Sequence, residues 1–238
     1  MKFPILFCLA TTLLTAQATA PEVEITSEPH HHLVFENKSV RVFNVEVPPN
    51  TETLTHWHRH DYISTSIGPG EIANTVKDKP LINVKLQDGE TRFVSATFAH
   101  FVRDIGAQPF RNVTVEILED ESLRNSTPKW DATKDTKDQD RRLADVTNGT
   151  KKVLFVKDGI RVSQTELQPG AVIPTHHHTS PHLLIAVSDL DLRSDVEGQA
   201  PTAEHFKSGD SKWIPGGYTH TLTNTSTKPA KYVTLEFP

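Results

Sequence analysis

Cysteine is almost absent from this chain of 238 residues, because Cys8 is the only one. A framework of disulfide bonds is therefore excluded as the source of its stability. No stretch after residue 20 approaches the roughly 20 apolar residues of a membrane-spanning helix. An excess of basic residues is also missing, since the net charge is -5 and both signs are interspersed, which excludes nucleic acid as a natural partner.

The first 20 residues, MKFPILFCLATTLLTAQATA, have the pattern of a secretory signal peptide. A lysine precedes a short apolar run, and Ala18-Thr19-Ala20 is a small-residue pattern at which such peptides are cut. A membrane anchor is the alternative, but the run is too short for one and contains Pro4. We expect cleavage after Ala20, which leaves a mature chain with neither cysteine nor membrane segment. Such a chain suits the bacterial periplasm or the medium.

The remaining sequence repeats itself at a constant offset of 120 residues, without a gap. Thr55-His56-x-His58 recurs as Thr175-His176-x-His178, and His100 recurs as His220. We interpret residues 33–118 and 153–238 as two copies of one domain. Residues 119–152, which are dense in charged and polar side chains, are predicted to form a polar linker.

Each copy has the local pattern of β-strands. Segments such as VRVFNVEV, RNVTVEIL and KYVTLEF alternate apolar and polar residues and favour valine, threonine and aromatics. Short turn-forming pieces rich in proline and glycine separate them, and no segment shows a long helical period. We predict an all-β protein whose copies are sandwiches or barrels.

Histidines occur in the second copy at spacings that suit a metal site. His176 and His178 are two positions apart, so in a strand they share one face at a separation of about 6.6 Å. Two such imidazoles can converge on one ion with bonds of roughly 2.1 Å. His182 follows on the same stretch, and a later strand would bring His220 alongside. The first copy has His56, His58 and His100 at the equivalent positions.

The fourth ligand position differs between the copies. Tyr62 stands where the second copy has His182, and strand alternation also places His60 on the face of His56 and His58 unless a bulge intervenes. Register favours Tyr62 as the ligand. Chemistry favours His60, because tyrosine titrates near 10 unless a metal lowers its pKa. Both residues are candidates.

These residues resemble the two sequence motifs of the cupin family. The first family motif usually ends in glutamate, where this chain has His182, and the second motif is matched at every fixed position. The resemblance implies a bicupin, with two double-stranded β-helix (jelly-roll) barrels in tandem and a metal pocket inside each. The chain is also similar to exported bacterial cupin-domain proteins. In the first copy, Ser95 and Thr97 replace the proline and glycine of the second motif, which puts that turn in question. The matching segments are Gly170-x5-His176-x-His178-x3-His182 and Gly209-x5-Pro215-x-Gly217-x2-His220-x3-Asn224.

With His182 in place of the glutamate, all four ligands of the second copy are neutral. A bound divalent ion would keep its full charge and be a stronger Lewis acid and a better host for an anionic substrate. Imidazole-rich sites accept Fe, Mn, Ni, Cu or Zn, so ligand type does not select the metal. Glu116 and Glu236 occupy equivalent strand positions, where they are candidate general bases or partners of the ligands. Solvated positions on the outer face of the sheet are the alternative.

The leading hypothesis is an exported, metal-dependent oxygenase that binds a small organic substrate beside O₂. One alternative is a non-catalytic protein that captures a metal or a small anionic ligand. Another is a sugar isomerase or epimerase in which Glu116 or Glu236 moves a proton. Two fused barrels reduce the need for a partner chain, so we expect a monomer or a homodimer. The run His30-His31-His32 precedes the first copy and is expected to be incidental surface.

Overall fold

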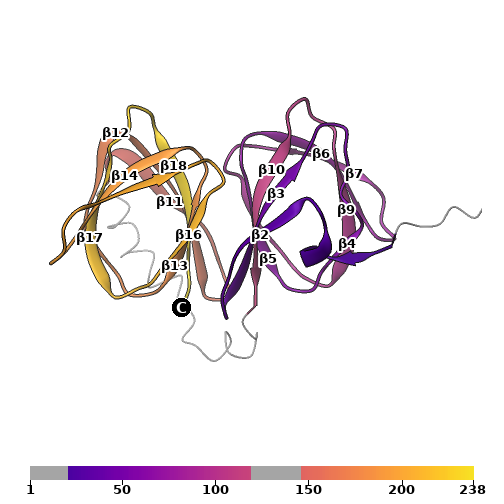
Figure 1. The fold of residues 1–238 in the computed structure, drawn as a ribbon, viewed down its shortest axis with the longest axis horizontal. Helices are drawn as coiled ribbons and strands as arrows, with labels where there is room; N and C mark the ends of the chain where they lie inside the picture. The colour runs from indigo at the N-terminus through magenta and orange to yellow at the C-terminus, as the bar shows by residue number, and fades with distance from the viewer. Residues whose placement is uncertain (1–20, 119–145) are drawn as a thin grey trace, which may run out of the picture.

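The computed structural model describes residues 21–118 and 146–238, and the predicted signal peptide and most of the predicted linker lie outside these ranges. The regular structure is almost entirely β, since the described residues contain a single helix, the 3-10 turn η1 (Ile25–Ser27). Figure 1 shows two barrel-like halves side by side, the first in indigo to magenta and the second in orange to yellow. The prediction of an all-β protein is confirmed.

The first half contains ten strands in two five-stranded sheets. The sheet orders are β2-β3-β10-β5-β8 and β1-β4-β9-β6-β7, and the only parallel pair described in them is β1 with β4. Regular structure begins ahead of residue 33, where the sequence predicted the first domain to start. The strands are β1 (Val23–Glu24), β2 (His31–Glu36), β3 (Val40–Val47), β4 (His56–His58), β5 (Tyr62–Ser66), β6 (Gly70–Val76), β7 (Ile82–Leu86), β8 (Thr91–Val94), β9 (Phe98–Asp104) and β10 (Phe110–Ile117).

The second half is one eight-stranded sheet in the order β15-β14-β17-β12-β18-β13-β16, with β11 paired to β12. The long strand β12 pairs with β18 through residues 161–167 and with β17 through residues 172–178. Because β11 begins at Thr147, the sheet starts inside the segment expected to be linker. The strands are β11 (Thr147–Lys157), β12 (Ile160–His178), β13 (His182–Ala186), β14 (Leu190–Val196), β15 (Thr202–Phe206), β16 (Ser211–Ile214), β17 (Tyr218–Asn224) and β18 (Ala230–Glu236).

The offset of 120 residues seen in the sequence recurs in the pairing of the strands. Residues that pair across two strands in the first half have counterparts, 120 positions later, that pair in the second half. The repeat is therefore structural as well as sequential. Three such pairs lie at the candidate site: His56 with His100 and His176 with His220, Arg41 with Glu116 and Arg161 with Glu236, and Tyr62 with Glu116 and His182 with Glu236.

The turn before β9 keeps the backbone of its counterpart although its glycine is replaced. Gly217 has φ of 84° and Thr97 has φ of 71°, so both lie in the left-handed region that favours glycine. A β-branched residue there is strained by about 1–2 kcal/mol. The same hydrogen bond holds both turns, since the Thr97 N–H donates to the His58 carbonyl at 2.9 Å and the Gly217 N–H to the His178 carbonyl at 2.7 Å. The turn geometry is preserved.

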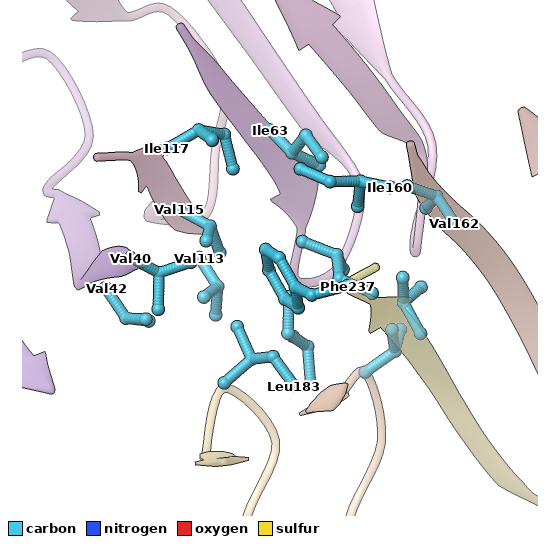
Figure 2. Close-up of a cluster of buried hydrophobic side chains, with 14 of the residues drawn as sticks. Val40, Val42, Ile63, Val113, Val115, Ile117, Ile160, Val162, Leu183 and Phe237 are labelled. Carbon is cyan, nitrogen blue, oxygen red and sulfur yellow. The ribbon is translucent and has the colours of Figure 1, made fainter. Parts of the chain in front are cut away.

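Three clusters of buried apolar side chains organise the packing, one inside each half and one between them. The cluster between the halves joins β3, β5 and β10 of the first to β12, β13 and β18 of the second (Figure 2). Ile63, Val115, Leu183 and Leu235 are almost completely buried there. Each such side chain contributes roughly 1.5–3 kcal/mol by leaving water, so this interface is a major source of stability.

Polar contacts at the edge of this interface are reciprocal. The Arg111 guanidinium donates to the Ser208 carbonyl at 2.7 Å, and the Lys231 ammonium lies 3.0 Å from the Asp88 carboxylate. Lys231 and Ser208 are the counterparts of Arg111 and Asp88 at the offset of 120. Each half therefore contacts the same turn of the other, as in an interface with two-fold symmetry.

Candidate metal centres

Three histidines of the second half converge inside it. His176 and His178 lie at the end of β12, and His220 faces them from β17. The Nε2 atom of His176 is 3.0 Å from that of His178 and 3.1 Å from that of His220, and the third separation is 3.3 Å. Three cis ligands of an octahedral ion with bonds of roughly 2.1 Å would have their nitrogen atoms about 3.0 Å apart. The geometry of the cluster therefore fits a metal ion.

The hydrogen bonds of these rings favour the tautomer that a metal needs. His176 Nδ1–H donates to the Pro174 carbonyl at 2.7 Å, which leaves the lone pair on Nε2. His220 Nδ1 is 2.8 Å from the Ser194 hydroxyl. His178 Nδ1 lies 3.7 Å from a carboxylate oxygen of Glu236. The inward-facing nitrogen of each ring is thus Nε2.

The first half repeats this arrangement with His56, His58 and His100. The Nε2 atom of His100 is 3.0 Å from that of His56 and 3.1 Å from that of His58. His56 Nδ1–H donates to the Leu54 carbonyl at 2.9 Å, and His100 Nδ1–H donates to Asn74 Oδ1 at 2.9 Å. The Nε2 atoms of His56 and His100 therefore present two lone pairs to each other, an arrangement that a cation between them would stabilise.

The fourth positions lie beside the clusters, and their rings stack on the second histidine. The His182 ring is 4.3 Å from that of His178 with planes 23° apart, and the Tyr62 ring is 4.2 Å from that of His58 with planes 21° apart. The buried Nδ1 atom of His182 has no hydrogen-bond partner among the described residues. His60 lies in the turn between β4 and β5, away from the three converging histidines.

Glu116 and Glu236 form ion pairs beside the clusters. Glu236 pairs with Arg161, and Glu116 accepts from the Arg41 guanidinium at 3.1 Å. Burial raises the pKa of Glu236, but the hydrogen bond from His178 and the charge of Arg161 prevail and lower it to about 2. Burial raises the pKa of Glu116, and Arg41 only partly opposes this. The two carboxylates are thus placed as partners of the ligand histidines, in different electrostatic settings.

Burial lowers the pKa of the cluster histidines, because the charged imidazolium is poorly solvated there. The pKa falls to about 4 for His56 and His176 and to about 3 for His100 and His220. The like charges of neighbouring histidines add to this effect in both halves. At neutral pH the rings are uncharged and able to bind a metal.

The two clusters line cavities of different size. The cavity of the second half is about 350 Å³, and that of the first is about 150 Å³. Phe110 contributes its ring to the first cavity, whereas its counterpart in the second half is Ala230. Leu184 and Leu192 provide apolar walls in the second half. The larger cavity has room for a small organic molecule beside the histidines.

Sequence reasoning missed two residues at the first cluster, and the expectation that the N-terminal histidine run is incidental surface is wrong for His31. The His31 ring lies 4.6 Å from that of His56 and lines the same cavity. Its Nδ1 atom is 2.6 Å from the carboxylate of Glu28, which is 1% exposed. Lys151, the counterpart of His31, lines the second cavity and was assigned to the linker. Extending the 120-residue comparison upstream by two positions would have paired these residues.

No helix in the described residues has the length and apolar character needed to cross a bilayer. No curated protein sequence matches the chain. Among solved structures, oxalate decarboxylase from Bacillus subtilis is 13% identical with a TM-score of 0.56, over 84% of this chain and 68% of that one. AerE from Microcystis aeruginosa is 13% identical with a TM-score of 0.55, over 89% and 98% of the two chains. A cupin 2 conserved barrel domain protein from Leptotrichia buccalis is 12% identical with a TM-score of 0.52, over 87% and 88%.

These likenesses show that the chain has the cupin fold. The family model of the cupin domain matches residues 163–236, a range that contains His176, His178, His182, His220 and Glu236. The matched domain and the shared fold together place this protein in the cupin superfamily.

Proposed function

We propose that this protein is an exported bicupin metalloenzyme, a metal-dependent oxygenase whose active site is the histidine cluster of the second half. The observation that carries the proposal is the convergence of three neutral Nε2 atoms, 3.0 to 3.3 Å apart, on a cavity of about 350 Å³. A divalent transition metal bound there would supply Lewis-acid and redox chemistry to a small organic substrate.

The bicupin assignment is supported by the repeat of strand register and by the reciprocal interface between the halves. The paired positions of β12 with β17 and of β12 with β18 have counterparts in the first half. We propose that residues 33–118 and 153–238 form the cores of two cupin barrels, extended by the strands that precede them. Because the two barrels already cover each other's apolar faces, a monomer or a homodimer of this chain is the expected assembly.

The residues around the second cluster have separable tasks. His176, His178 and His220 would hold the ion on one side, which leaves its other side open to the cavity. Glu236 faces His178 Nδ1 and fixes the tautomer of that ring, as a carboxylate does for many ligand histidines. The apolar wall excludes water from the reacting groups and strengthens electrostatic interactions there.

The alternatives are less well supported by this geometry. A sugar isomerase would need Glu236 as a proton acceptor, but its pKa of about 2 makes it a weak base at neutral pH. A non-catalytic binding protein is the better second candidate, because the first cluster is more deeply buried and its cavity is smaller. We propose that the first cluster binds a metal in a supporting role, through His56, His58 and His100.

Metal analysis of the purified protein tests the centre itself. After reconstitution with Fe, Mn, Ni, Cu or Zn in turn, we expect two metal equivalents per chain by mass spectrometry of the elements. His176→Ala and His56→Ala should each lose one equivalent. His177→Ala is the matched control, since its ring lies beside Thr219 Oγ1 at 3.0 Å rather than in the cluster. Unchanged metal content in His176→Ala would contradict the assignment.

Oxygen consumption then tests the reaction class. We expect O₂ uptake by the metal-loaded protein with at least one member of a panel of phenols, enols and small keto and dicarboxylic acids. His176→Ala should abolish this uptake, whereas His177→Ala should retain it. A fully loaded protein that consumes no O₂ with any panel member would refute the oxygenase proposal, and tight retention of a panel member without turnover would favour the binding protein. Release of CO₂ from oxalate without net O₂ uptake would assign the reaction named for the Bacillus subtilis structure instead.

A further inference from the structure

The two halves differ at one register position that faces both clusters. In the second half Lys151 of β11 pairs with Thr165 of β12, and in the first half His31 of β2 pairs with Val45 of β3. These pairs are related by the offset of 120 residues. Each strand therefore contributes one basic residue to its cavity, but the residue is a lysine in one case and a histidine in the other.

Lys151 lies at the boundary between the interior of the second half and its entrance. It lines the cavity of about 350 Å³ and also an adjoining cavity of about 380 Å³. Both cavities share His176 and His178 with it. A ligand that enters through the second cavity and reaches the histidine cluster would pass the ammonium group.

The charge balance beside the two clusters has opposite signs. Beside the second cluster, the positive charges of Lys151 and Arg161 face the single carboxylate of Glu236. Burial is the largest influence on that carboxylate, and the charges of Arg161 and Lys151 both lower its pKa. The excess positive charge would attract an anionic ligand.

In the first half, two carboxylates face one cation. Glu28 binds His31 Nδ1 at 2.6 Å and also accepts the Leu54 N–H at 3.1 Å, and Glu116 pairs with Arg41. The counterpart of Glu28 in the second half is Asn148, which carries no charge.

The other charged residues on the cavity walls do not alter this contrast, because they are paired. Glu204 in the second cavity binds the Lys212 ammonium at 2.9 Å, and Arg92 in the first cavity pairs with Glu90.

We propose that Lys151 is the anion-recognising residue of the second pocket, and that its ligand is a small carboxylate. This inference rests on the proposed metal centre, because one carboxylate oxygen would reach the ion while a second anionic oxygen accepts a hydrogen bond from the Lys151 ammonium. Such charge-assisted bonds are stronger than those between neutral groups. The first pocket, where Glu28 holds His31, lacks an equivalent cationic anchor and does not select anions.

Binding of oxalate to the manganese-loaded full chain tests this assignment by calorimetry. Lys151→Gln should weaken oxalate binding by about 10- to 100-fold, the loss of one charge-assisted hydrogen bond. Lys151→Arg should retain most of the affinity because it keeps the charge. Lys152→Gln is the matched control, since this lysine is the exposed neighbour on the same strand. Oxamide, the neutral analogue of oxalate, should show no preference for the wild type over Lys151→Gln.

Manganese content measured on the same samples separates the two proposals. Full metal content in Lys151→Gln together with weaker oxalate binding supports the role of Lys151. Equal oxalate affinity of Lys151→Gln and wild type at full metal content would overturn it, as would the absence of oxalate binding by metal-loaded wild type. Failure of the wild type to bind manganese or any other divalent transition metal would instead overturn the proposed metal centre.

Discussion

Replacing His56 by glutamine should make the metal-free protein less sensitive to acid. His56 is completely buried, and its pKa is lowered to about 4, mainly by burial and further by the charge of His31. In the unfolded chain the group titrates near 6.5. Between these two values the unfolded state binds more protons than the folded state, so the free energy of unfolding falls as the pH falls from about 6.5 to about 4. Glutamine does not titrate and removes this contribution.

The size of the effect follows from the two pKa values. At pH 4.5 an unfolded histidine is almost fully protonated, whereas one with a pKa of about 4 is mostly neutral. The resulting proton linkage destabilises the fold by about 2.5 kcal/mol at pH 4.5 and by a negligible amount at pH 7. The drop in unfolding free energy between pH 7 and pH 4.5 should therefore be about 2.5 kcal/mol smaller in His56→Gln than in wild type.

Urea denaturation of the metal-free proteins at the two pH values measures this difference. Loss of packing around the substituted side chain affects both pH values and cancels in the comparison. His32→Gln is the control, because His32 is exposed in the same N-terminal histidine run as His31 and should leave the pH difference unchanged. An identical pH difference in His56→Gln and wild type would refute the conclusion that this histidine is held neutral by burial.

Two further substitutions test the interface and the support of the ligands. Leu183→Ala removes a fully buried side chain from the cluster between the halves and should lower the free energy of unfolding by about 2–5 kcal/mol, measured by urea denaturation, whereas a loss below 1 kcal/mol would mean that the halves do not stabilise each other. Glu236→Gln keeps the size of the side chain but removes the charge beside His178 Nδ1, so it should weaken metal binding at the second cluster about 10- to 100-fold by competitive chelator titration, without changing the first cluster.

Much of the site could be predicted because the sequence is repeated. Alternation along a strand placed His176 and His178 on one face, and the offset of 120 residues identified His56, His58 and His100 as their counterparts. The structure brings both sets together through the same register. The all-β class followed in the same way from alternating segments and turn residues. These features depend on local geometry and on spacing, which a sequence displays directly.

Other features depend on contacts between segments that the sequence does not pair. His31 belongs to the first cavity because Glu28, buried under the N-terminal strand, fixes its ring. Nothing in a run of three histidines distinguishes the middle one until the register of β2 with β3 is known. The start of β11 at Thr147 was missed for a related reason, since its polar residues form an edge strand whose pairing with β12 outweighs its composition.

The fourth position shows most clearly where spacing stops being informative. His182 and Tyr62 differ in their value as metal ligands, yet both rings stack on the second histidine of their cluster at nearly the same distance, 4.3 and 4.2 Å. What the two residues share is a flat ring, so we infer that this position orients His178 and His58 rather than completing the coordination. Each centre then has three histidine ligands, and their difference must arise elsewhere, from the volume of the cavity and from the residue at positions 31 and 151.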